Sequence, residues 1–324
     1  MKFRTLAASL AGVGRLIWLL LRTGVIAVAA AAFRLGLAGF SVIVVFQLAL
    51  AVIMGVAWAS LGRGGAKTTL GAFIGARLVR DAASQALPFT QVGGIVIGAR
   101  ALALDGVGGD FALASTISDL AVEFVTQIAF VALGGGLLAW LRPHNALDKP
   151  VLAVVAALAL MAGGMIFAQF WGARWIEGAL RRILKRAPGD GGETPVAQAF
   201  QDIARSPARI ALACGLHLAA WLLAGIQTWI TLRLLDVNVG LGGAVVLDSL
   251  TAGVKAVAFF VPASLGVQEG VLVLVGLIFG IAPSAALALS LIRRARDLVI
   301  GLPVLAVWQL RHGDRIWRRR SERS

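Results

Sequence analysis

Three polar side chains recur at helical spacing within an apolar stretch of this 324-residue chain. Asp119, Glu123 and Gln127 are four residues apart, so on a helix they form a single polar stripe. Two neighbouring carboxylates could bind and release a proton, because burial and like charge disfavour having both ionised. An ionisable group inside an apolar segment points to function by default, since burying its charge is costly. The stripe is therefore a candidate proton-coupling site.

Basic residues upstream of the stripe offer a second interpretation. Arg77, Arg80 and Arg100 lie in the stretch that precedes it, and Asp81 follows Arg80. These guanidiniums could pair with the carboxylates and hold two helices together, which would make the stripe structural. Both interpretations hold if the pairs must open before a ligand can enter. The same arginines are candidates for holding a lipid headgroup.

A second charged group lies toward the C-terminus: Lys255, Glu269, Arg293, Arg294, Arg296 and Asp297. Guanidinium groups bind phosphate or carboxylate through two parallel hydrogen bonds, so arginines at membrane depth could hold a lipid phosphate. Lys255 could face the same cavity. Alternatively, the final stretch is two short helices with these charges at the membrane interface. Glu269 could cap a helix N-terminus or contact a ligand.

Composition restricts the class of protein. The chain is 59% hydrophobic with a mean hydropathy of +0.88, well above the roughly 45–50% apolar usage of soluble domains. We therefore expect an all-α polytopic integral membrane protein. The net charge of +14 comes mostly from basic residues in connections and at the ends. These suit anionic lipid headgroups, and no soluble basic domain is left to bind nucleic acid.

Redox, metal and catalytic chemistry find little support in the sequence. There is one cysteine, Cys214, and the three histidines lack the spacing of metal ligands. No nucleophile–base pair or phosphate-binding loop is recognisable. We therefore expect no metal, no cofactor and no enzymatic activity. His217 is expected to bond a buried neighbour on a membrane helix.

Hydrophobic spans and charged connections divide the chain into five parts. They are an N-terminal span with an interfacial helix (1–40), a first membrane half (41–172), a basic cytoplasmic connection (173–209), a second membrane half (210–311) and a basic cytoplasmic tail (312–324). Apolar spans are predicted at 41–61, 111–141, 151–171, 210–234 and 285–310.

Each membrane half contains an interrupted apolar segment. The candidate break residues are Pro88, Gly93 and Gly94 in the first half and Pro262, Gly266 and Gly270 in the second. Proline lacks a backbone donor and glycine permits left-handed dihedrals. Broken backbone at membrane depth must be buried in protein or line a wet cavity. The basic residues of the connections indicate that the first hairpin faces the cytoplasm and the second faces the outside. We therefore predict an inverted-topology repeat with two re-entrant helical hairpins.

The segment Phe259–Gly270, together with Leu87–Gly94 and Arg100, resembles the lysylphosphatidylglycerol synthase transmembrane-region family. The resemblance covers nearly the whole chain, and within the family it is strongest to the hopanoid biosynthesis-associated branch, HpnL. It implies an integral inner-membrane protein related to the half of aminoacyl-phospholipid synthases that moves lipid between leaflets. No soluble transferase domain is recognisable in the 324 residues, so aminoacyl transfer is not expected.

Three functional hypotheses remain open. The leading one is a flippase or transporter for hopanoid, phospholipid or a related amphiphile, with membrane lipids as its partners. The alternative is a non-transporting scaffold or regulator of lipid biosynthesis that binds biosynthetic enzymes through residues 174–209. A membrane enzyme that acts on lipid is the weakest, because no catalytic motif is present.

Overall fold

Helices account for nearly all of the chain that the computed structural model describes. It describes residues 35–62, 68–86, 90–143, 195–258 and 266–321, with isolated positions at 33, within 149–164, and at 261 and 264; at 86, 90–92 and 313–321 only the backbone is described. These described residues contain no strand. The predicted all-α architecture is confirmed.

The first membrane half consists of a long helix, two short helices and a second long helix. α3 spans Gly36–Ser60, α4 Leu70–Ala86, α5 Thr90–Leu104 and α6 Gly109–Leu141. α3 is apolar around its whole circumference, as expected of a helix that faces both lipid and protein. α4 is amphipathic, and its arginines are buried.

The second half repeats this order. α10 spans Pro207–Leu234, α11 Leu241–Val257, α12 Val267–Ile278 and α13 Pro283–Ser321. Between the halves lies the short helix α9, Pro195–Ala204, which packs on α6. Both halves therefore place a pair of short helices between two long ones.

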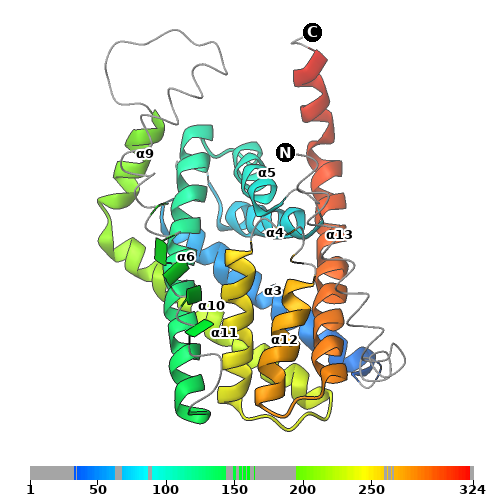
Figure 1. Cartoon of the computed structure of the whole chain (residues 1–324). Coiled ribbons are helices and arrows are strands. Elements are labelled where there is room, and N and C mark those ends of the chain that lie inside the picture. Colours follow the sequence, from blue (N-terminus) through cyan, green and yellow to red (C-terminus); the bar gives the residue numbers. More distant parts are fainter. Residues whose placement is uncertain are drawn as a thin grey trace.

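Contacts between the halves follow a two-fold pattern. α4 packs against α13, α11 packs against α6, and α3 packs against α10. Exchanging the halves converts the first contact into the second and leaves the third unchanged. In Figure 1 the α4–α5 hairpin lies toward one end of the molecule and the α11–α12 hairpin toward the other, while α6 and α13 run in opposite directions. This is the arrangement of an inverted repeat.

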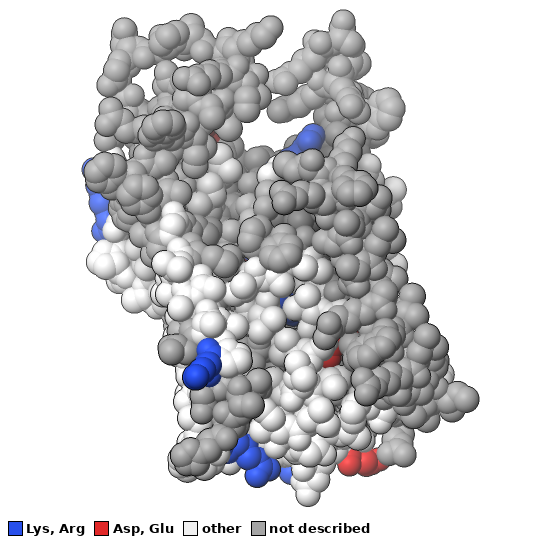
Figure 2. All heavy atoms as spheres, in the orientation of Figure 1, with Lys and Arg blue, Asp and Glu red and all other residues white. Residues whose placement is uncertain are grey.

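The distribution of polarity is that of a membrane protein. Among the described helices, α3, α6 and α10 are long and apolar enough to cross a membrane. The described surface in Figure 2 is mostly uncharged, and large apolar side chains such as Val45, Leu222 and Leu274 are exposed. Exposed apolar groups around buried charges reverse the pattern of a water-soluble protein. The chain is a multi-pass membrane protein.

The first hairpin forms as predicted, but two of its glycines have another role. Pro88, between α4 and α5, lies outside the described residues. Gly93 and Gly94 do not break a helix, because both lie inside α5. A Cβ at Gly94 would overlap the Ser84 hydroxyl and crowd the Arg80 carbonyl. Gly94 therefore allows α5 to pack closely on α4.

The second hairpin turns at Gly266. This residue precedes α12 with a φ of +74°, a left-handed conformation that glycine adopts without steric cost. Pro262 lies outside the described residues. Gly270 was predicted to belong to the break, yet it lies within α12, because the helix already begins at Val267.

Several predicted boundaries need correction. Residues 36–40, assigned to an interfacial helix, belong to the membrane helix α3. Residues 1–32, most of the 151–171 span and the connection at 165–194 lie outside the described part. α13 is one continuous helix that extends into the predicted tail. The interpretation of its charged stretch as two short interfacial helices is therefore wrong.

The inverted repeat predicts that equivalent connections face opposite sides of the membrane. Gly108 precedes α6, Ala282 precedes α13, and both are exposed. In a Cys214→Ser background, a membrane-impermeant maleimide should label Gly108→Cys from the cytoplasmic side only and Ala282→Cys from the outer side only, as the basic connections require. Labelling of both positions from one side would contradict the inverted repeat, and exchanged sides would contradict the orientation.

Candidate functional site

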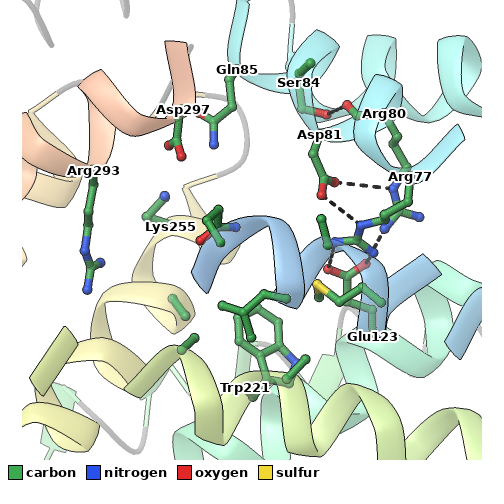
Figure 3. A pocket seen from close by; sticks show the side chains of 18 of the residues that line it. Arg77, Arg80, Asp81, Ser84, Gln85, Glu123, Trp221, Lys255, Arg293 and Asp297 are labelled. Atoms are coloured by element: carbon green, nitrogen blue, oxygen red, sulfur yellow. Dashed lines mark hydrogen bonds and ion pairs between the residues drawn. The ribbon is translucent and has the colours of Figure 1, made fainter. Parts of the chain in front are cut away.

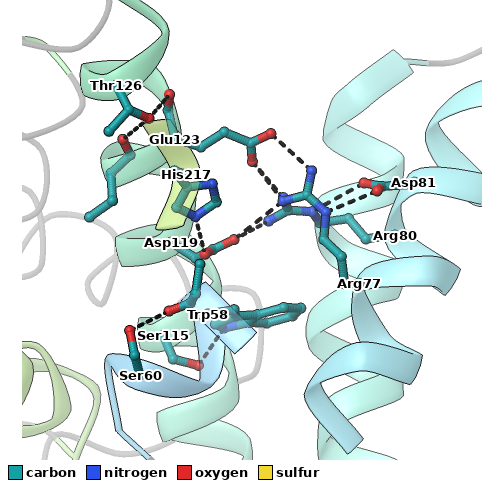
Figure 4. Close-up of polar contacts among 12 residues, drawn as sticks. Trp58, Ser60, Arg77, Arg80, Asp81, Ser115, Asp119, Glu123, Thr126 and His217 are labelled. Atoms are coloured by element: carbon teal, nitrogen blue, oxygen red, sulfur yellow. Dashed lines mark hydrogen bonds and ion pairs between the residues drawn. The ribbon is translucent and has the colours of Figure 1, made fainter. Parts of the chain in front are cut away.

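Charged side chains of α4 and α6 meet between these helices, and His217 of α10 lies beside them (Figure 4). We call them the first cluster: Arg77, Arg80, Asp81, Asp119, Glu123 and His217. The two Nη atoms of Arg77 donate to Glu123 at 2.9 Å, and its Nε donates to Asp81 at 2.9 Å. Arg80 donates to Asp119 at 2.8 Å and to Glu123 at 2.6 Å. Asp119 and Glu123 therefore face protein, and the pairing interpretation is confirmed for these two arginines.

His217 extends the first cluster to α10. Its Nε2 lies 2.9 Å from Asp119 Oδ1, and both side chains are fully buried. Nδ1 of the ring has no hydrogen-bond partner among the described residues. Asp119 thus contacts α4 through one oxygen and α10 through the other. The prediction that His217 bonds a buried neighbour is confirmed.

Neutral contacts surround the first cluster. The Arg80 guanidinium lies 5.5 Å from the ring centroid of Trp58 on α3, within cation–π range, and the Trp58 indole N–H donates to Ser115 Oγ at 3.3 Å. Gln127, the third member of the stripe, donates to the Ala252 carbonyl of α11 at 3.0 Å. Gln127 therefore links the two halves instead of binding a carboxylate.

Charges of the second half gather between α11, α12 and α13. We call them the second cluster: Asp248, Lys255, Glu269, Arg293, Arg294, Arg296 and Asp297. Arg293 pairs with Asp248, and Asp248 also accepts from the Thr228 hydroxyl at 2.9 Å. Arg294 donates to Glu269 at 2.9 and 2.8 Å. Arg296 pairs with Asp297 at 2.8 Å and donates to Gln227 at 2.8 Å.

Glu269 caps α12 as well as pairing with α13. One of its oxygens accepts the Gly266 N–H at 2.9 Å, and the other accepts the Ser290 hydroxyl at 2.6 Å in addition to Arg294. The residue is 1% exposed. The capping interpretation is confirmed, and this carboxylate fixes the start of α12 relative to α13.

Lys255 differs from the arginines of the second cluster. Its Nζ donates to the amide oxygen of Gln268 at 3.0 Å, and Gln268 in turn donates to Ser290 at 2.8 Å. Among the described residues, no carboxylate forms an ion pair with Lys255. The second cluster therefore holds four cations and three carboxylates, whereas the first holds two guanidiniums and three carboxylates beside His217.

The clusters occupy equivalent positions with their charges exchanged. Arg77 follows Leu70, the first residue of α4, by seven positions, and Asp248 follows Leu241 of α11 by seven. Likewise Asp119 lies ten positions into α6 and Arg293 ten positions into α13. In the first half the hairpin supplies the guanidinium and the long helix the carboxylate. In the second half the assignment is reversed.

A cavity of about 340 Å³ lies between the two clusters. Asp81 and Glu123 reach its wall from α4 and α6, while Lys255, Arg293 and Asp297 reach it from α11 and α13 (Figure 3). The volume lies at the lower end of the roughly 300–1,000 Å³ found for ligand pockets. It suits a headgroup or another small polar group, with the rest of an amphiphile outside.

One predicted site residue lies elsewhere. Arg100 is exposed on α5 and does not line the cavity, so it belongs to neither cluster. Arg294 and Glu269 pair behind the cavity wall, which they do not line. Asp248 was not predicted, although it is a carboxylate that follows the apolar first turns of α11. The rule that an ionisable group inside an apolar segment points to function, which selected Asp119, would also have selected Asp248.

Neutralising Asp119 should destabilise the protein strongly, because the carboxylate is fully buried and contacts two other helices. We expect Asp119→Asn to lower the free energy of unfolding by about 3–5 kcal/mol, visible as a lower thermal midpoint in detergent. Asp202→Asn is the matched control, because its pair with Arg205 is exposed and should contribute less than about 1 kcal/mol. Equal midpoints for the two variants would mean that the first cluster adds little stability.

Comparison with known proteins identifies the family. A family model described as the lysylphosphatidylglycerol synthase TM region matches residues 5–304. The match includes both hairpins, both clusters and the cavity, and it associates the chain with membrane proteins that handle lipid. Searches of curated proteins and of solved structures find no match. The chain belongs to the lysylphosphatidylglycerol synthase transmembrane-region family.

Proposed function

We propose that the protein moves an amphiphilic lipid between the leaflets of a bacterial inner membrane, with its C-terminus in the cytoplasm. The proposal rests on one observation: a charged cavity lies between two inverted hairpins inside an otherwise apolar exterior. A headgroup would bind among the charges while the acyl chains or the hopanoid skeleton stay in the bilayer. Family membership supports lipid handling, and the hopanoid branch is part of the proposal.

The ion pairs suggest a gating role for most of the arginines. Arg77 and Arg80 join the first hairpin to α6, and Arg293 and Arg294 join the second hairpin to α13. In the proposed cycle one hairpin separates from its long helix while the other stays closed. The cavity would then open to one side of the membrane at a time.

Headgroup binding would compensate the charges that opening leaves unpaired. Removing one partner of a buried ion pair costs about 3–5 kcal/mol, and a phosphate can replace a carboxylate on a guanidinium. From the sequence, these arginines were candidates for holding the headgroup directly. That interpretation loses support, because all five arginines of the two clusters already pair with a carboxylate. In our proposal the headgroup phosphate instead takes the place of a carboxylate on a guanidinium when an ion pair opens.

A non-transporting scaffold or regulator of lipid biosynthesis is the second candidate. It would use the basic connection, of which only residues from 195 onward are described. α9 packs its buried residues Ala199 and Ile203 toward α6, which leaves less apolar surface for an enzyme partner. We assign no catalytic step to the protein.

Filling the cavity tests the proposed transport. Ala224 lines the cavity, whereas Leu222, two residues earlier on α10, is exposed. In vesicles that contain a fluorescent phospholipid, Ala224→Trp should slow leaflet exchange at least about tenfold, because the indole fills space that the headgroup needs. Leu222→Trp and Arg100→Gln should exchange at the wild-type rate, since both positions lie outside the cavity.

Equally fast exchange in Ala224→Trp would contradict transport through this cavity. Lipid binding without any exchange in the wild-type protein would favour the scaffold.

A further inference from the structure

One positive charge on the cavity wall forms no ion pair with a carboxylate among the described residues. Lys255 lines the cavity, and its only described hydrogen-bond partner is the neutral amide of Gln268. An ammonium group has three donors, so two remain without a described partner. Because each arginine of the second cluster has its own carboxylate, the excess positive charge of that cluster resides at Lys255, which Asp297 attracts without forming an ion pair.

The surroundings hold this ammonium in place without neutralising it. Gln268 is 5% exposed and is itself fixed by Ser290, so its oxygen is directed to Lys255. Asp297 is the competing carboxylate, but Arg296 holds its Oδ1 through two nitrogens, and no ion pair joins it to Lys255. A cation kept at membrane depth without an ion-paired carboxylate is costly, and an anionic ligand beside it would lower that cost.

We propose that Lys255 is the centre of an anion subsite that binds the phosphate of a lipid headgroup, with Arg293 and Arg296 beside it. All three side chains line the cavity, and Figure 3 shows Lys255 below Asp297 and to the right of Arg293. Phosphate oxygens accept charge-assisted hydrogen bonds from ammonium and guanidinium groups. That the phosphate belongs to a lipid rests on the proposed function. The anion subsite itself does not, because a free phosphate ester would bind through the same chemistry.

The test measures ligand binding to the purified full chain in dodecyl maltoside, a detergent without phosphate. Native mass spectrometry follows phosphatidylglycerol and the neutral diacylglycerol with the same acyl chains, and equilibrium dialysis follows radiolabelled glycerol 3-phosphate. Phosphatidylglycerol should bind to the wild-type protein and diacylglycerol should not. Lys255→Gln should weaken phosphatidylglycerol binding at least about tenfold, which corresponds to one charge-assisted hydrogen bond.

Two variants serve as matched controls. Lys255→Arg keeps the positive charge and should retain binding, whereas Arg100→Gln removes an exposed charge outside the cavity and should bind as the wild type does. The thermal midpoint of ligand-free Lys255→Gln should equal or exceed that of the wild type. The reason is that this variant leaves three cations facing three carboxylates in the second cluster. With such a midpoint, a loss of binding cannot be ascribed to misfolding.

The outcomes separate the subsite from the transport. Wild-type affinity in Lys255→Gln overturns the subsite, and so does a lower midpoint of that variant, because the lysine would then be structural. If glycerol 3-phosphate binds and phosphatidylglycerol does not, the ligand of the subsite is not a lipid. Phosphatidylglycerol binding that depends on Lys255, without leaflet exchange, supports the subsite and counts against the proposed transport.

Discussion

A charge at membrane depth is costly unless a countercharge lies beside it, and this constraint explains how the short helices are held. α4, α5, α11 and α12 have 17, 15, 17 and 12 residues, whereas a span needs about 20. They cannot be positioned by crossing the bilayer alone. Ion pairs to α6 and α13 position α4, α11 and α12 instead, and α5 packs on α4. Asp119, which contacts both α4 and α10, ties the first hairpin to the second half.

Interactions within each half differ from those between the halves. Within a half, guanidinium–carboxylate pairs join hairpin to long helix. Between the halves, neutral amides contribute, since Gln127 donates to the Ala252 carbonyl and Gln227 donates to the Ile43 carbonyl. Neutral hydrogen bonds contribute about 0.5–1.5 kcal/mol each, less than charged ones. Such an interface suits motion of one half against the other, with His217 and Asp119 as the charged link that crosses it.

The sequence allowed the class, the helix order and the polar stripe to be predicted, because these depend on apolar run length and helical period. It did not distinguish the two uses of glycine: Gly266 supplies a left-handed turn, whereas Gly94 supplies close packing inside α5. Period also fails to reveal which face of a short helix meets the protein, so Arg100 was placed with Arg77 although it is exposed.

Asp81 is the carboxylate of the first cluster from which separation would start. Its side chain is 39% exposed, against 0% for Asp119 and 15% for Glu123. Because this side chain is partly exposed, solvent would screen its attraction to Arg77, and this contact is the least costly to break. Arg77 would keep Glu123 while Asp81 turned to the cavity, and Arg80 would keep Asp119. Because Arg77 and Asp81 both lie on α4, loss of this contact leaves the hairpin attached to α6. The hairpin would separate only when Glu123 and then the fully buried Asp119 release the two arginines.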